Sequence, residues 1–135
     1  MSDDVAEGFS RTGRCLCGAV RFRFAGEPIW IAHCHCESCR RATSSAVATF
    51  VSVRAEGFEF TGAEPVAYRS SPGALRRHCR VCGSPLSYEH EDYAGEMHLY
   101  AASLDRSDGV VPTKHDFWSE RVPWLTVGDD LPKND

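Results

Sequence analysis

The sequence lacks the features that would place the chain in several large protein classes. Its longest apolar run is far shorter than the roughly 20 residues of a membrane-spanning helix, and its acidic first residues do not resemble a secretory signal. Its formal charge of -4 at pH 7 is opposite in sign to the basic surface that nucleic-acid binding usually requires. We therefore expect a cytoplasmic protein with neither a membrane nor a nucleic acid as its partner.

Several common catalytic motifs are also missing. There is no Gly-x-Ser-x-Gly elbow, no phosphate-binding Gly-rich loop with a lysine, no Gly-x-Gly-x-x-Gly and no His-Glu-x-x-His. These absences argue against the common serine hydrolases, nucleotide-binding folds and helical zinc proteases. Any chemistry must come from another set of residues.

No segment shows a sustained helical period, and short runs of strand-like residues dominate instead. In 19–24, for example, Val20, Phe22 and Phe24 alternate with Arg21 and Arg23, as in a half-buried strand. Further strands are expected near 29–32, 46–53, 58–60, 66–69, 86–88 and 97–101, with a helical turn near 40–45 and an ordered turn at 115–118. Residues 1–12 are expected to form a flexible lead-in, and 13–135 a single, mainly β domain of short strands around metal sites.

Seven cysteines are present, an odd number. In a reducing compartment, closely spaced cysteines are more often metal ligands than disulfide partners. The tightest group comprises Cys34, Cys36 and Cys39. On an extended segment Cys34 and Cys36 point to the same side, and a turn after Cys36 brings Cys39 to the same point. Three thiolates leave a tetrahedral zinc ion one ligand short, which is typical of catalytic rather than structural zinc.

The remaining cysteines form two pairs that together can fill a closed, structural zinc site: Cys15, Cys17, Cys79 and Cys82. A different partition would put Cys15, Cys17, Cys34 and Cys36 on one metal and leave Cys39 with Cys79 and Cys82. Spacing favours the first partition, because Cys39 would otherwise have to turn away from its neighbours. A redox role for Cys79 and Cys82 lacks the βαβ context that such motifs have.

Histidines flank the proposed ligands, and His33, His35 or His78 could supply a fourth ligand to a zinc ion. His35 lies between two cysteines and should point to the opposite face, where it would support the ligands or be exposed. The other three, His90, His98 and His115, are expected to be surface or partly buried residues without a metal role.

Arginines also gather near the proposed ligands, although the chain is acidic overall. The candidates for holding the carboxylates of a ligand are Arg40, Arg41 and Arg76, because guanidinium pairs with carboxylate through two parallel hydrogen bonds. The alternative is that these side chains offset thiolate charge or are simply solvated.

In their order and spacing, four stretches of the chain resemble the glutathione-dependent formaldehyde-activating enzyme (GFA) family, which includes centromere protein V. The stretches are 13–20, 34–40, 71–73 with 79–86, and 103–105 with 112–115, and the resemblance covers about residues 13 to 132. It implies a mainly β fold of small curved sheets around two zinc ions per chain. The implied structural zinc lies on Cys15, Cys17, Cys79 and Cys82, and the catalytic zinc on Cys34, Cys36 and Cys39.

The resemblance also implies a carbon–sulfur lyase, which joins glutathione and formaldehyde into S-hydroxymethylglutathione. The expected partners are thus a small thiol such as glutathione and an aldehyde, with Arg40, Arg41 and Arg76 near the glutathione carboxylates. A non-catalytic zinc module that binds a macromolecular partner is the alternative function.

Overall fold

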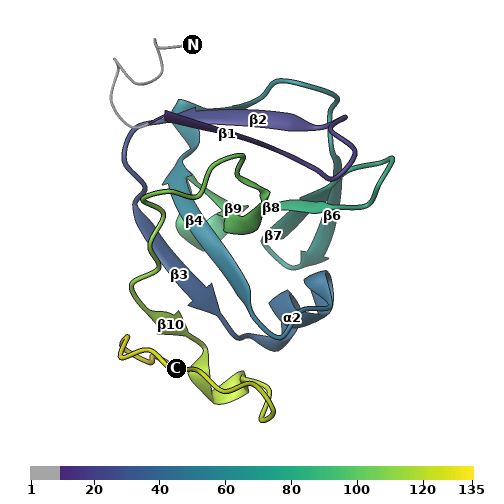
Figure 1. Cartoon of the computed structure of the whole chain (residues 1–135). Coiled ribbons are helices and arrows are strands. Elements are labelled where there is room, and N and C mark those ends of the chain that lie inside the picture. The colour runs from purple at the N-terminus through teal and green to yellow at the C-terminus, as the bar shows by residue number, and fades with distance from the viewer. Residues whose placement is uncertain (1–9) are drawn as a thin grey trace.

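A computed structural model describes residues 10–135, which form two β-sheets and one short helix (Figure 1). The smaller sheet has the strand order β1-β2-β5, with bounds β1 (Ser10–Arg14), β2 (Arg21–Ala25) and β5 (Phe58–Phe60). The larger sheet has the order β10-β3-β4-β9-β8-β7-β6, with bounds β3 (Trp30–Cys34), β4 (Ala48–Arg54), β6 (Val66–Ser71), β7 (Ala74–His78), β8 (Pro85–His90), β9 (Glu96–Tyr100) and β10 (His115–Asp116). The helix α2 (Glu37–Thr43) connects β3 to β4. The mainly β class is confirmed.

The main core lies between the two sheets. The smaller sheet contributes Phe22 and Phe24 from β2, each only 1% exposed, as the alternation in the sequence predicts. The larger sheet contributes the apolar side chains of Val51, Val53, Met97, Leu86 and Leu99. Burial of this apolar surface is the principal force that holds the two sheets together.

The opposite face of the larger sheet carries a second, smaller cluster. Phe50 of β4 and Tyr100 of β9 are neighbours across paired strands and point to this face, while Val51 and Leu99 point to the main core. Cys34 and Cys39 pack in the same cluster as Phe50 and Tyr100. Strand alternation therefore places the three closely spaced cysteines behind the main core, with aromatic rings around them.

Several boundaries differ from those expected from the sequence. Strand β1 begins at Ser10, so three residues assigned to the lead-in pair with β2 instead, while residues 1–9 lie outside the described part of the chain. The helix starts at Glu37 rather than after Cys39. Strands β7 and β10 were not expected: β7 carries two arginines and a histidine in place of apolar alternation, and β10 has two residues and pairs with the distant strand β3.

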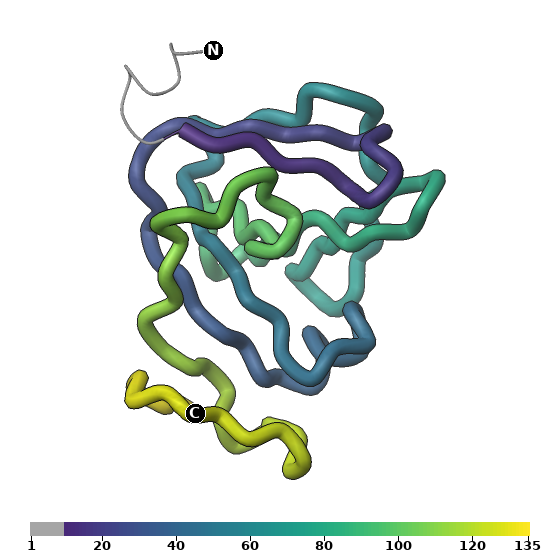
Figure 2. Tube along the Cα trace, viewed as in Figure 1, coloured from purple at the N-terminus to yellow at the C-terminus, as the bar shows by residue number. Residues whose placement is uncertain are grey.

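The C-terminal segment folds back along β10 (Figure 2), on the side of β10 opposite to β3. The amide of His115 donates to the carbonyl of Pro132, and the amide of Asn134 donates back to the carbonyl of His115. Phe117 adopts a positive φ of 57° just before a 3₁₀ turn at Trp118–Glu120. No helix in the described range is long and apolar enough to cross a membrane.

The close packing around Gly13, against Phe22 of the neighbouring strand and the 3₁₀ turn at Ala101–Ser103, predicts an effect for Gly13→Ala. A Cβ at this position would collide with the ring of Phe22 and lie 2.7 Å from the carbonyl oxygen of Ser103. We expect a loss of about 1–3 kcal/mol in the free energy of unfolding, as for other overpacked sites. Urea denaturation measures it, with Gly128→Ala as control because nothing lies within 4 Å of a Cβ there. Equal midpoints for the two variants would contradict the close approach.

Candidate metal centres

The first cysteine cluster joins the turn after β1 to the turn after β7. Its four sulfurs, those of Cys15, Cys17, Cys79 and Cys82, all lie within 4.8 Å of one another. Backbone amides point at these sulfurs: Val20 donates to Cys15 at 3.3 Å, and Val81 to Cys79 at 3.3 Å. The hydroxyl of Ser84, 3.2 Å from the Cys82 sulfur, lowers the pKa of that thiol to about 5. These hydrogen bonds stabilise negative charge on the sulfurs that accept them.

The second cluster contains the sulfurs of Cys34, Cys36 and Cys39, again within 4.8 Å of one another. Cys34 ends β3, Cys36 is the N-cap of α2, and Cys39 lies in its first turn. The sulfur of Cys36 accepts a hydrogen bond from the amide of Cys39 at 3.2 Å. Within residues 10–135, no other cysteine, histidine or carboxylate joins this group.

The sulfur spacing in both clusters fits a tetrahedral ion. With metal–sulfur bonds of about 2.3 Å, two ligands of a tetrahedral zinc lie about 3.8 Å apart. The separations Cys15–Cys17, Cys17–Cys79 and Cys34–Cys39 are each 3.7 Å. Each cluster could therefore hold a metal ion, with four thiol ligands in one case and three in the other. This grouping is the partition favoured by the spacing in the sequence.

The three-cysteine cluster is electrostatically asymmetric. The thiols of Cys34 and Cys39 stabilise a thiolate at Cys36 and lower its pKa to about 2, while the same contacts raise the pKa of Cys34. Arg76 of β7 adds a positive charge, because its Nη2 lies 3.7 Å from the Cys39 sulfur. Its other terminal nitrogen donates to the hydroxyl of Tyr100 at 3.0 Å, and the guanidinium lies over the ring of Tyr88 at 4.6 Å.

The three thiols line a cavity of ≈ 420 Å³. Aromatic side chains form much of its wall, among them Trp30, Phe50 and Tyr88, while the charged residues that line it include Lys114, Asp116 and Glu120. Lys114 and Asp116 form an ion pair at 3.3 Å. The cavity thus combines a soft-donor site, an apolar wall and charges of both signs.

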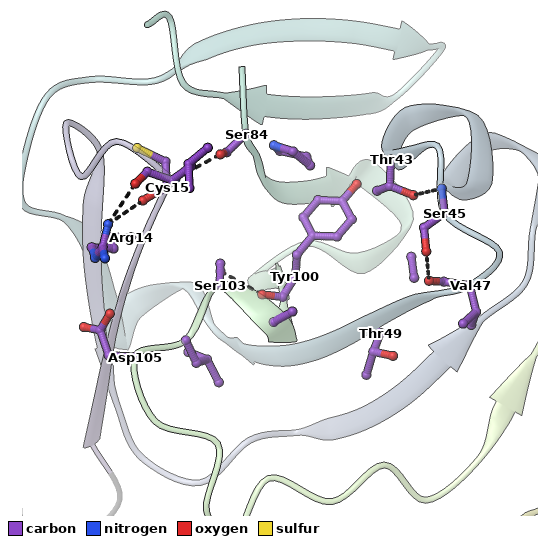
Figure 3. Close-up of a pocket in the computed structure, with 15 residues that line it drawn as sticks. Arg14, Cys15, Thr43, Ser45, Val47, Thr49, Ser84, Tyr100, Ser103 and Asp105 are labelled. Carbon is purple, nitrogen blue, oxygen red and sulfur yellow. Dashed lines mark hydrogen bonds between the residues drawn. The ribbon is translucent and has the colours of Figure 1, made fainter. Parts of the chain in front are cut away.

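Two further cavities flank this site. One, of ≈ 610 Å³, shares Ser38, Ser70 and Arg76 with the cavity of the three thiols and is also lined by Arg41 and Arg77. The other, of ≈ 590 Å³, lies between the end of α2 and the turn after β1, and Tyr100 stands in the middle of its lining residues (Figure 3). Burial raises the pKa of Tyr100 to about 12, so its hydroxyl keeps its proton at neutral pH. Tyr100 lines this cavity and the cavity of ≈ 610 Å³.

With this geometry in place, comparison with known proteins is informative. The profile of a family described as "Glutathione-dependent formaldehyde-activating enzyme" matches residues 10–120, most of the chain. The chain belongs to this family. The resemblance read from the cysteine spacing is thereby confirmed, and the two clusters are consistent with the two zinc sites of the GFA fold.

A crystal structure of a Rhodobacter sphaeroides protein is similar to this chain, with a TM-score of 0.60 and 24% sequence identity. The match covers 75% of this chain and 97% of that one. At this identity the similarity shows the fold alone. A search of curated protein sequences finds no match.

The three arginines singled out from the sequence lie in different settings in this GFA protein. Arg76 contacts the cluster itself, as described above. Arg40 points its Nε at the carbonyl of His35, 3.4 Å away. Arg41 is largely exposed and forms an ion pair with Glu37 at 2.8 Å. It lines the cavity of ≈ 610 Å³, the flanking groove. The structure thus brings Arg41 and Arg76 to one groove, while Arg40 is directed at the backbone.

The histidines are more buried than the sequence indicated. His35 points away from the three thiols, as expected, but it is 1% exposed, and its Nε2 lies 2.8 Å from Nδ1 of His115. His98 and His115, expected at or near the surface, are also buried. The sequence did not indicate that His115 contacts His35, because the two residues are 80 positions apart. The one signal in the sequence was the ordered turn expected at 115–118 within a loop-like segment.

The burial of His98 predicts a pH dependence. Burial lowers its pKa below the ordinary 6.5, although the Glu96 carboxylate, 2.9 Å from Nε2, opposes this. Below about pH 6.5 the unfolded chain therefore binds a proton that the folded chain does not. The free energy of unfolding should fall with decreasing pH, and His98→Gln should reduce the slope by up to about 1.4 kcal/mol per pH unit.

Urea denaturation of both proteins between pH 7 and 5 measures this effect. Acid also protonates thiolates in both proteins, so the difference between the two slopes, rather than either slope alone, reports His98. Identical slopes would show that the buried imidazole does not titrate differently in the folded state.

Proposed function

We propose that this GFA protein binds two zinc ions through cysteine and acts as a carbon–sulfur lyase-type enzyme that joins a small thiol to an aldehyde. The family name points to glutathione and formaldehyde as substrates. One observation carries the proposal: three thiols converge on a cavity of ≈ 420 Å³, while the other four cysteines are grouped with one another elsewhere. The three-thiol site then has a position for substrate, and the four-cysteine site does not.

The donor sets support zinc at both positions, because thiolates are preferred ligands of zinc and the sulfur spacings match a tetrahedral site. When bound by three thiolates, zinc supplies a Lewis acid with room for a fourth ligand and lowers the pKa of a thiol in that position. The remaining contributions come from the protein. Arg76 offsets negative charge at Cys39, and Tyr100 holds the guanidinium in place.

The reaction needs one proton transfer. A bond forms between the thiol sulfur and the aldehyde carbon, the carbonyl π bond breaks, and the thiol proton ends on the new hydroxyl. The phenol of Tyr88 and the carboxylate of Glu120 line the cavity. We propose that Tyr88 donates a hydrogen bond to the aldehyde oxygen and that Glu120 accepts the thiol proton and passes it to the new hydroxyl. The aromatic wall excludes water and so protects a reactive aldehyde adduct.

The flanking groove is the place we propose for the rest of the thiol substrate. Glutathione carries two carboxylates and one ammonium group, so it needs charges of both signs. Arg41 in the groove offers a cation, and the Lys114–Asp116 pair in the cavity offers a cation and an anion. Ser38 and Ser70 line both spaces, so a ligand several atoms long can extend from one into the other.

Metal content provides the first prediction of this proposal. Cys39→Ser should lose one of two thiolate-bound zinc ions and keep the fold, because Cys39 belongs to the three-thiol site alone. Cys79→Ser should unfold or greatly weaken the protein, because a closed zinc site contributes an apparent binding free energy of about 10–16 kcal/mol in small peptides. Elemental analysis and circular dichroism measure both effects. Full zinc retention in Cys39→Ser would contradict the assignment of an open zinc site to Cys34, Cys36 and Cys39.

Activity provides the second prediction. NMR should show faster formation of the hydroxymethyl adduct from glutathione and formaldehyde than the uncatalysed background, and Cys39→Ser should abolish the acceleration. Arg41→Ala should raise KM for glutathione about two- to five-fold and leave kcat unchanged, since an exposed charge pair contributes little energy. Arg80→Ala is the control, because Arg80 is exposed outside the groove. No acceleration with any thiol would instead favour the non-catalytic zinc module.

A further inference from the structure

A third group of side chains that could hold a metal ion lies on the opposite face of β3. Cys34 points into the cavity described above, whereas the preceding residue His33 points to the opposite face of the strand. His115 pairs with His33 in the parallel register of β10 and β3. One ring nitrogen of each histidine and one carboxylate oxygen of Asp129 lie within 4.8 Å of one another. None of these three residues lines the cavities described above.

Hydrogen bonds already orient both imidazoles from behind. His33 Nδ1 lies 2.8 Å from the hydroxyl of Thr49, and His115 Nδ1 lies 2.8 Å from His35 Nε2. Metal-binding histidines are held in this way, with one ring nitrogen bonded to the protein and the other left for the ion. His115 Nε2 faces both oxygens of Asp129, at 3.0 and 3.1 Å.

We propose that His33, His115 and Asp129 form a third metal site, which binds a divalent transition ion of the zinc type through two imidazoles and one carboxylate. Imidazole and carboxylate donors suit such ions, and three protein ligands leave one or more positions open. The assignment concerns residues outside both cysteine clusters and does not depend on the proposed enzymatic function.

The proton positions agree with this assignment. Coordination through Nε2 places the proton of each neutral imidazole on Nδ1. His115 then donates to Nε2 of His35, and His33 donates to the hydroxyl oxygen of Thr49. The hydrogen bonds to His35 and to Thr49 are retained, and the ion replaces only the contact between His115 and Asp129.

The distances require one small movement. With metal–ligand bonds of about 2.0–2.2 Å, two ligand atoms lie about 2.9–3.4 Å apart. His115 and Asp129 are already in this range at 3.0 Å. The ligand nitrogen of His33 lies within 4.8 Å of the other two ligand atoms, so a small shift of this partly exposed ring completes the set. The side chain of His115 is 3% exposed and that of Asp129 is 36% exposed, so an ion enters from the Asp129 side.

Cobalt binding to the full chain tests this proposal. Cobalt bound by thiolates absorbs strongly through sulfur-to-metal charge transfer, whereas cobalt bound by nitrogen and oxygen does not, so the two kinds of site are counted separately in one titration. We expect three bound equivalents, the third of which adds no charge-transfer absorption. Asp129→Asn should bind two and keep the full charge-transfer band.

Matched variants make the outcome decisive. Asp130→Asn should retain three equivalents, because Asp130 is exposed and does not belong to the cluster. His33→Gln should lose the third equivalent, and Thr49→Val should weaken it by about 10–100-fold, as for other residues that orient a metal-bound histidine. The absence of an equivalent without charge-transfer absorption in the unaltered protein, or its retention in both Asp129→Asn and His33→Gln, would overturn the proposal. The band intensity reports the cysteine sites independently, so their failure is recognised as a separate result.

Discussion

The four-cysteine cluster is the constraint on which the rest of the structure depends. Cys17 and Cys79 are 62 positions apart, yet their sulfurs lie 3.7 Å from each other. Four thiols gain little from mutual contact, and closing a chain loop of this length costs conformational entropy. In the proposed zinc form, the ion supplies the attraction that holds the turn after β1 against the turn after β7. Strands β2 to β7 lie between these two turns, and with them Cys34, Cys36, Cys39 and Arg76.

The larger sheet then separates two kinds of chemistry by strand alternation. On β3, Ala32 and Cys34 face the aromatic cavity, and His33 faces the other way. On β4, Phe50 lies with the thiols, while Thr49 pairs with His33 and bonds to it. The thiol of Cys34 therefore lies on one face and the imidazole of His33 on the other, although the two residues are adjacent in the sequence. His35 joins the two faces, since its backbone lies between two cysteines and its ring contacts His115.

The sequence was most informative where the relevant contacts are local. The grouping of Cys34, Cys36 and Cys39 follows from spacing, because a strand end and one helical turn fix three side chains within six residues. The inward-facing residues of β2 follow equally from alternation. Contacts between distant segments were not predictable in this way. The hydrogen bond between His35 and His115, and that between Arg76 and Cys39, join residues 80 and 37 positions apart, and neither leaves a periodic signal.

The two strands that were missed also leave no periodic signal in the sequence. Strand β10 has two residues, too few for any alternation to be visible, and it exists because β3 and the chain near Pro132 offer partners on either side. In β7, three of the five residues are arginine or histidine, and four of the five are partly exposed. Its sequence therefore does not resemble that of a buried strand. Its position between β6 and β8 nevertheless fixes Arg76 beside the thiols. A residue that decides the electrostatics of the site is thus placed by strand pairing rather than by its own sequence neighbourhood.

Charge balance explains why Arg76 is needed there. In the proposed zinc form, four thiolates exceed the charge of one divalent ion by two, and the backbone amides that point at Cys15 and Cys79 stabilise this excess. Three thiolates exceed it by one, and the guanidinium beside Cys39 offsets that single charge. The three-thiol site is then close to neutral before any substrate arrives. An incoming thiol can lose its proton there without adding to a large negative charge, whereas the four-thiolate site would resist it both sterically and electrostatically.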